Sequence, residues 1–128
     1  MRRRPELKGK LLIQGTWDAE IIEDLKPEEG DIVVNKQRYS GFVGTNLDVI
    51  LKTYDIKHTA FIGVAANGCV DSTLRMAFFL EYFPILISDA VNYLGPAFTL
   101  EATTFIVKLL FGWVTDSKEF CRSLKTKP

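Results

Sequence analysis

The chain has little of what marks several large classes of protein. Its 128 residues include two cysteines and one histidine, and 16 lysines and arginines balance 16 aspartates and glutamates. Two distant cysteines make no disulfide framework, and a lone histidine without partners at ligand spacing argues against a metal site. The balanced charge argues against a nucleic acid or an acidic membrane as partner. No apolar run approaches the 18 or more residues that span a bilayer.

What is present fits a globular protein. Hydrophobic residues make up 47% of the chain and charged residues 25%, which argues against disorder. The basic start Arg2-Arg3-Arg4 is not followed by an apolar stretch, so no secretion signal is expected. We therefore predict a cytoplasmic protein with a single domain over residues 1–128.

The texture of the chain changes at Asp31. Residues 1–30 are polar and interrupted by glycine and proline, so they are predicted to be loop with room for one short helix. Beyond them, short β-branched or apolar runs predict strands. These predicted strands cover residues 31–34, 59–64, 84–88 and 112–115, and Pro84 must lie at the start of its strand.

Apolar residues at helical spacing separate these runs. The predicted stripes are Leu47, Ile50, Leu51 and Tyr54; Val70, Leu74, Ala77 and Phe78; and Phe98, Ala102, Phe105, Ile106 and Leu109, with a further helix from Asp116. Strands that alternate with helices predict right-handed crossovers and a parallel sheet. The predicted fold class is α/β, a three-layer αβα structure with a mostly parallel sheet.

Reactive side chains follow two of the predicted strands. Ligands of an open parallel sheet gather beyond the carboxyl ends of its strands. Lys36 follows the strand over 31–34, and Cys69 lies where the strand over 59–64 passes into a helix. The positive end of a helix favours thiolate over thiol, and a nearby ammonium favours it further, so Lys36 and Cys69 make a coherent pair for acyl transfer. The alternative is that Cys69 is a small buried hydrophobe, as most cytosolic cysteines are.

Other candidates have a plain structural interpretation. Cys121 is predicted to pack beside Phe120 and Leu124 in the last helix. Asn67 has a functional interpretation, but its place before a helix also suits an N-cap. Asp89, at the end of a strand, suits a structural hydrogen bond at least as well as catalysis.

These residues resemble those of a known family. Val64-Ala65-Ala66-Asn67-Gly68-Cys69-Val70-Asp71-Ser72-Thr73 is similar to the nucleophile turn of the isochorismatase-like cysteine hydrolases, and Lys36 with Tyr39-Ser40-Gly41-Phe42 resembles the lysine segment of that family. Within the family the likeness is greatest to ureidoacrylate amidohydrolases of pyrimidine degradation. Further similar segments, such as Gly95-Pro96-Ala97-Phe98 and Phe111-Gly112-Trp113-Val114, extend it from Arg4 to Leu124.

The resemblance implies a mechanism. Cys69 would be the nucleophile, Lys36 would stabilise its thiolate, and the backbone amides of Ala65 and Cys69 would form the oxyanion hole. Tyr39 and Asn67 would contact the substrate, and the Val64–Ala65 peptide bond would be cis. A small amide or ureido acid would be hydrolysed through a thioester without metal or organic cofactor, by a protein that forms homo-oligomers.

The sequence also departs from the family pattern. Ala66 stands where the family usually has Thr, and Gly68 precedes the cysteine, which predicts a lost hydroxyl contact and a looser turn. The family's catalytic Asp, at the end of a first apolar strand, has no counterpart before Lys36. We therefore expect a chain that lacks the N-terminal strand and helix of the family, with an apolar sheet edge exposed and little activity on its own.

Two alternatives follow. A catalytically impaired family member could persist as a fragment or an interaction module. The chain could also be a flavodoxin-like binding module with Cys69 as a redox sensor. The lack of a Gly-rich phosphate loop after the strands argues against this alternative.

Overall fold

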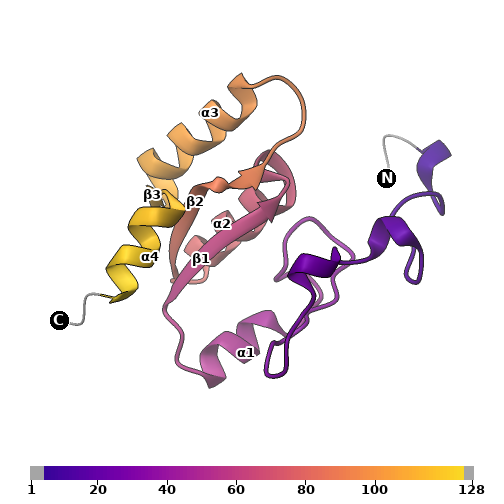
Figure 1. The fold of residues 1–128 in the computed structure, drawn as a ribbon, viewed down its shortest axis with the longest axis horizontal. Helices are drawn as coiled ribbons and strands as arrows, with labels where there is room; N and C mark the ends of the chain where they lie inside the picture. The colour runs from indigo at the N-terminus through magenta and orange to yellow at the C-terminus, as the bar shows by residue number, and fades with distance from the viewer. Residues whose placement is uncertain (1–4, 126–128) are drawn as a thin grey trace. The chain divides into compact units, whose positions relative to one another are not determined.

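A computed structural model describes residues 5–125 (Figure 1). These residues belong to two compact units, one ending at Val33 and the other beginning at Val34. The first unit contains three single-turn 3₁₀ helices, Pro5–Leu7, Trp17–Ala19 and Glu23–Leu25, joined by loop. The loop prediction is confirmed for residues 5–30, with three short turns of helix in place of one, and residues 1–4 lie outside the described residues. The prediction of a single domain over the whole chain stays a prediction.

The second unit is built around a parallel sheet. Its strands are β1 (His58–Val64), β2 (Phe83–Asn92) and β3 (Trp113–Thr115), in the order β1-β2-β3. Pro84 is the second residue of β2, where it is tolerated. The pairing joins Phe61 to Leu86 but Gly63 to Val91, so β2 bulges between these pairs. The predicted strands over 59–64, 84–88 and 112–115 are therefore confirmed.

Helices cover the sheet on both sides. In sequence order the helices of this unit are α1 (Leu47–Thr53), which lies away from the faces of the sheet, a π-helical turn (Ala66–Val70) leading into α2 (Asp71–Phe79), α3 (Phe98–Ile106) with a second π-helical turn (Val107–Phe111), and α4 (Ser117–Lys125). In Figure 1, α4 lies in front of the sheet and α2 behind it. The α/β class with a parallel sheet between helices is confirmed.

The core lies between α2 and the sheet. It consists of Val70, Leu74, Leu86 and Val107, packed against partly buried Phe61, Val91, Phe111 and Val114. The stripe predicted on α2 is confirmed, because Val70, Leu74 and Ala77 are buried, while Phe78 at its end is 42% exposed. Burial of these side chains is the main source of the stability of this layer.

One prediction about an element is wrong. Residues 31–34 form no strand: Ile32 and Val33 are more than half exposed, and within residues 5–125 no ladder includes them. Their β-branched side chains favour extended backbone, but a strand also needs a neighbour with which to pair.

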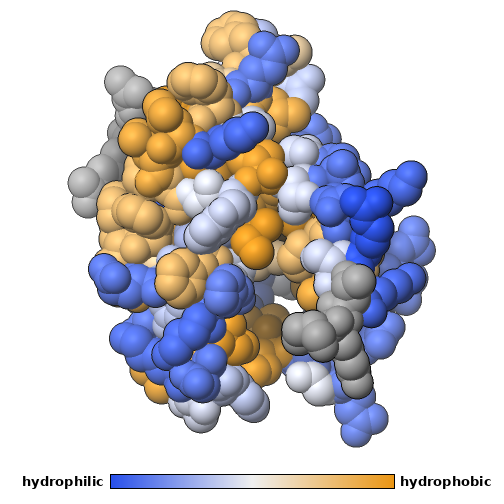
Figure 2. All heavy atoms as spheres, turned by 90° about the vertical axis from the view of Figure 1, so that its left-hand side faces the viewer, coloured by the Kyte–Doolittle hydropathy of each residue, from blue (hydrophilic) through white to orange (hydrophobic). Residues whose placement is uncertain are grey.

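The predicted helix with Phe98 and Phe105 is confirmed as α3, but its apolar stripe faces solvent, because Phe98, Phe105 and Leu109 are 60–64% exposed. The buried face of α3 instead holds Thr103, one turn before Val107. Thr103 can be buried because its hydroxyl donates to the carbonyl of Thr99 at 2.9 Å. Figure 2 shows apolar side chains gathered on the side of the unit that α3 and α4 form.

Candidate functional site

The turn after β1 holds Cys69 in a defined backbone. The Val64–Ala65 peptide bond is cis, as the resemblance implies. The carbonyl of Ala65 then accepts two hydrogen bonds, from the amide of Gly68 at 2.9 Å and from the amide of Val70 at 3.1 Å. Cys69 lies between these two bonded amides and is a free, half-buried cysteine. The turn therefore presents the thiol at the carboxyl end of the edge strand, directly before α2.

Asn67 fastens this turn to the segment after β2. Its side-chain Nδ2 donates to the carbonyl of Leu94 at 2.7 Å, and its Oδ1 accepts from the amide of Leu94 at 2.9 Å. The N-cap interpretation is wrong, because Ala65 holds the cap position of the π-helical turn. Since both ends of the Asn67 amide are occupied by one backbone unit, the residue is a clamp between two turns of the sheet edge.

Thr73, which the sequence analysis did not single out, connects Cys69 to the lysine segment. The Thr73 hydroxyl donates to the carbonyl of Cys69 at 2.6 Å and accepts from the amide of Gly41 at 3.0 Å. A threonine four residues after a helical cysteine commonly bonds back to its carbonyl, which is the signal that could have identified it. The second bond, to a residue 32 positions away, had no such signal.

The lysine segment begins exposed and becomes buried. Lys36 and Tyr39 are exposed, the latter to 72%, whereas Ser40 and Gly41 are buried. The ammonium of Lys36 donates to the carbonyl of Arg38 at 2.9 Å, within its own loop. The pairing of Lys36 with Cys69, and the contact of Tyr39 with substrate, stay predictions.

Aromatic and acidic side chains hold the rest of the segment. Phe42 stacks on Tyr82 with ring centroids 5.9 Å apart, and the Tyr82 hydroxyl donates to Asp48 of α1 at 2.8 Å. Burial, with a smaller effect from Asp48, raises the pKa of Tyr82 to about 12. Hydrogen bonds from Lys52 and then from Tyr82 lower the pKa of Asp48. The two side chains therefore favour the neutral phenol and the ionised carboxylate across a wide range of pH.

Other candidates are structural or peripheral. Asp89 accepts from the amide and the hydroxyl of Ser117, both at 2.7 Å, and these bonds lower its pKa. It therefore caps α4, in agreement with the structural interpretation. His58 stacks on Phe83 with the ring centroids 4.9 Å apart. Cys121 is exposed, so the prediction that it packs is wrong.

Within residues 5–125, no group of three or more His, Cys, Asp or Glu side chains could hold a metal ion. None of the helices in the same range has the length and apolar character of a membrane span.

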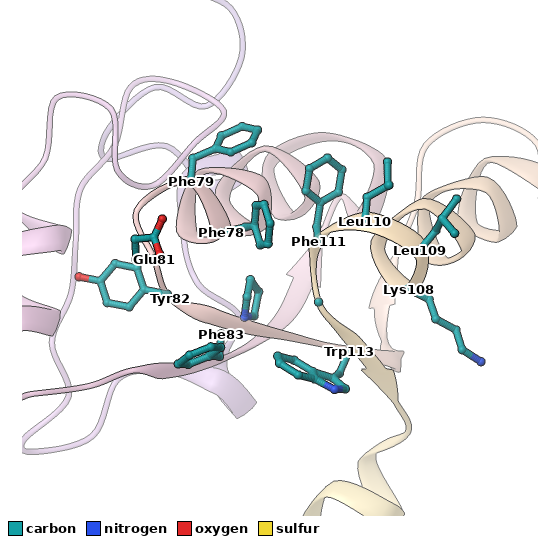
Figure 3. Close-up of a pocket in the computed structure, with 12 residues that line it drawn as sticks. Phe78, Phe79, Glu81, Tyr82, Phe83, Lys108, Leu109, Leu110, Phe111 and Trp113 are labelled. Atoms are coloured by element: carbon teal, nitrogen blue, oxygen red, sulfur yellow. The ribbon is translucent and has the colours of Figure 1, made fainter.

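A hollow of about 540 Å³ lies at the opposite end of the sheet from Cys69 (Figure 3). It is lined by residues around the beginnings of β2 and β3, among them Phe78, Phe79, Phe83, Phe111 and Trp113. Its walls are aromatic, and none of its lining residues belongs to the Cys69 turn. We therefore assign the candidate chemistry to the polar turn at the carboxyl ends of the strands and not to this hollow.

The comparison with known families decides the family of the chain. Residues 1–119 match the isochorismatase domain. The chain belongs to the isochorismatase family. The isochorismatase-family chain is 53% identical over 124 residues to the ureidoacrylate amidohydrolase RutB of Klebsiella pneumoniae, covering 97% of this chain and 52% of that protein. It is 50% identical to RutB of Agrobacterium fabrum, covering 94% of this chain and 53% of that protein.

Solved structures show the same fold. A cysteine hydrolase from Pseudomonas syringae has a TM-score of 0.90 at 30% identity, covering 98% of this chain and 64% of that one. N-carbamoylsarcosine amidase from Thermoplasma acidophilum has a TM-score of 0.77 at 31% identity, covering 89% of this chain and 64% of that one. The isochorismatase-family chain thus spans about half the length of the curated relatives that it matches.

Proposed function

We propose that this chain carries the nucleophile of a cysteine-dependent amidohydrolase that acts on ureidoacrylate-type or related small amides. The proposal is supported by identities of 53% and 50% to proteins named ureidoacrylate amidohydrolase and by structural likeness to an amidase of an N-carbamoyl compound. These similarities favour an amidohydrolase over a fragment that acts only as an interaction module.

The proposed reaction is acyl transfer in two stages. The Cys69 thiolate attacks the amide carbonyl, and the carbonyl electron pair moves onto oxygen, where the amides of Ala65 and Cys69 hold the charge. Collapse of this intermediate breaks the C–N bond, the leaving nitrogen takes up a proton from solvent water, and a thioester forms. Water then attacks the thioester, which releases the acid and regenerates the thiolate. Lys36 would stabilise the thiolate, and Tyr39 and Asn67 would contact the substrate.

The observation that carries this proposal is the placement of Cys69. The thiol is half-buried, between two amides that bond to one carbonyl, at the point where a parallel strand passes into a helix. Such a position combines access for a small substrate with the positive end of a helix. A substrate could not reach a fully buried cysteine, and a cysteine elsewhere on the surface would not lie at the positive end of a helix.

The chain contains its own reference thiol for a test. Cys121 is exposed on α4, whereas Cys69 is half-buried, so exposure alone predicts faster alkylation of Cys121. We expect iodoacetamide to modify Cys69 at least about tenfold faster than Cys121 at pH 6.5, because a thiolate is the reactive form. Peptide mass spectrometry of samples quenched over time measures both rates in one experiment.

Lysine variants test the second member of the pair. We expect Lys36→Ala to abolish the preference for Cys69 at pH 6.5, while Lys57→Ala, which removes an exposed lysine paired with Asp55, leaves it unchanged. Equal rates for Cys69 and Cys121 in the unmodified chain would contradict the proposal. Release of ammonia from ureidoacrylate, abolished by Cys69→Ser, would measure how much turnover this chain supports.

We also propose that the chain forms homo-oligomers and is cytoplasmic. The exposed apolar side chains of α3 and the turn that follows it, Phe98, Phe105, Leu109 and Leu110, support self-association. Two free cysteines support a reducing compartment. Light scattering during size exclusion would show a mass above the 14.5 kDa of one chain.

A further inference from the structure

Thr73 is the point at which the nucleophile turn and the lysine segment are joined. Its hydroxyl has one proton, which it donates to the carbonyl of Cys69 at 2.6 Å. The same oxygen accepts the amide proton of Gly41 at 3.0 Å. One hydroxyl thus bonds on one side to the residue that bears the thiol and on the other to the segment that bears Lys36.

The hydrogen bonds continue beyond Gly41. The Thr45 hydroxyl donates to the carbonyl of Gly41 at 2.5 Å and accepts from the amide of Leu47, the first residue of α1, at 3.3 Å. Both sides of the Gly41 residue are therefore bonded by threonine hydroxyls. A path of backbone and hydroxyl groups runs from the start of α1 to the carbonyl of Cys69.

Packing around residue 41 is tight. A Cβ atom built on Gly41 would lie 3.2 Å from the Thr73 methyl carbon and 3.4 Å from a Leu47 methyl carbon. Gly41 is buried, and the residues from Asn35 to Tyr39 before it are exposed. The lysine segment therefore first enters the packed structure at Ser40 and Gly41, four and five residues after Lys36.

From this geometry we propose that Thr73 is a positioning residue, which sets the place of the lysine segment relative to Cys69 through its shared hydroxyl. The role rests on the proposed function, because it presupposes that Lys36 acts on the Cys69 thiol. Thr73 touches the backbone of Cys69 and of Gly41, so it acts through them and not on the substrate.

The test is the pH dependence of Cys69 alkylation in full-length variants, with Cys121 as internal reference. Thr73→Val keeps the shape of the side chain but removes the hydroxyl. We expect it to reduce the alkylation of Cys69 at pH 6.5 by roughly tenfold, and much less at pH 9, where most thiols are ionised. Thr73→Ser keeps the hydroxyl and is expected to restore the rate at pH 6.5.

The matched control is Thr103→Val. Thr103 also bonds to the carbonyl four residues before it, at 2.9 Å, but that bond lies within α3. We expect this variant to leave the pH profile of Cys69 unchanged. If Thr73→Val does not fold, as judged by circular dichroism, Thr73→Ser and Thr73→Ala carry the same comparison, since both lack the methyl group and only one has the hydroxyl.

The outcomes separate the two proposals. Preferential alkylation of Cys69 in the unmodified chain that persists in folded Thr73→Val would overturn the role of Thr73 and leave the proposed function intact. Loss of the preference in Thr73→Val with recovery in Thr73→Ser would support the role. No preference for Cys69 in the unmodified chain would overturn the proposed function and the role of Thr73 with it.

Discussion

At the end of the sheet where β2 and β3 begin, aromatic side chains and closely approaching backbone hold the elements together. The rings of Phe78 and Phe111 pack edge to face with their centroids 5.6 Å apart, and the ring centroids of Phe83 and Trp113 are 6.2 Å apart. At the end where the strands finish, Asn67 and Asp89 bond to backbone in neighbouring turns. Packing between aromatic rings tolerates small changes in angle, whereas a hydrogen bond is strong only when donor and acceptor are aligned. The directional contacts, which hold backbone groups in a fixed orientation, are therefore at the end of the sheet that bears Cys69.

Gly112→Ala is expected to disrupt most strongly the packing at the end of the sheet where β2 and β3 begin. A Cβ atom on Gly112 would lie 2.2 Å from the carbonyl oxygen of Pro84, which is backbone and cannot rotate away. We expect a loss of at least about 3 kcal/mol in the free energy of unfolding, measured with urea.

Gly44→Ala is the control for this substitution, because Gly44 has a φ of +73° but open space around it. It should cost only about 1 kcal/mol, through backbone conformation alone. Equal losses in the two variants would show that the close approach to Pro84 is not what requires glycine.

Asn67→Ala tests the hydrogen bonds at the end of the sheet where the strands finish. The change leaves the amide of Leu94 without its partner, whereas the Leu94 carbonyl keeps the hydrogen bond from the Thr99 hydroxyl at 3.2 Å. Because Leu94 is 69% exposed, water replaces much of what is lost. We expect a loss of about 1 kcal/mol in stability and a larger relative effect on the alkylation of Cys69. Asn92→Ala, which removes a bond only to the adjacent amide of Tyr93, is the control and should leave Cys69 unaffected. An identical response of Cys69 in both variants would contradict the clamp.

Tyr82→Phe is expected to lower the free energy of unfolding at neutral pH by about 1 kcal/mol, for the lost bond to Asp48, without an effect on Cys69. Because the pKa of Tyr82 is raised to about 12, its contribution is complete below pH 10 and is lost as the pH rises from 10 towards 12. Urea unfolding at several pH values should show the stability of the unmodified chain falling faster in this range than that of Tyr82→Phe. Parallel curves would show that the phenol is not held neutral by the fold.

The sequence predicted those parts of the fold in which apolar pattern and burial coincide. On α2 the stripe of Val70, Leu74 and Ala77 meets the sheet, as its spacing predicts. On α3 the most apolar stripe faces outwards, because Thr103 satisfies its hydroxyl within the helix and can occupy the buried face. Periodicity identifies a stripe, but it cannot identify what the stripe meets.

The site was predictable to a similar extent. The position of Cys69 and the cis bond before it followed from the motif, and both are where the motif implies. The bonds of Asn67 to Leu94 and of Thr73 to Gly41 join residues 27 and 32 positions apart. No local pattern specifies such partners, because the tertiary fold alone brings them together.

The strand that leads to Cys69 is the outermost strand of the sheet, with Ile62 and Val64 well exposed. Its outer row of backbone groups has no strand partner among residues 5–125. A further parallel strand docked there, from whatever polypeptide, would run about 4.8 Å away. Because parallel neighbours end at the same edge of a sheet, such a strand would end beside the turn that bears Cys69.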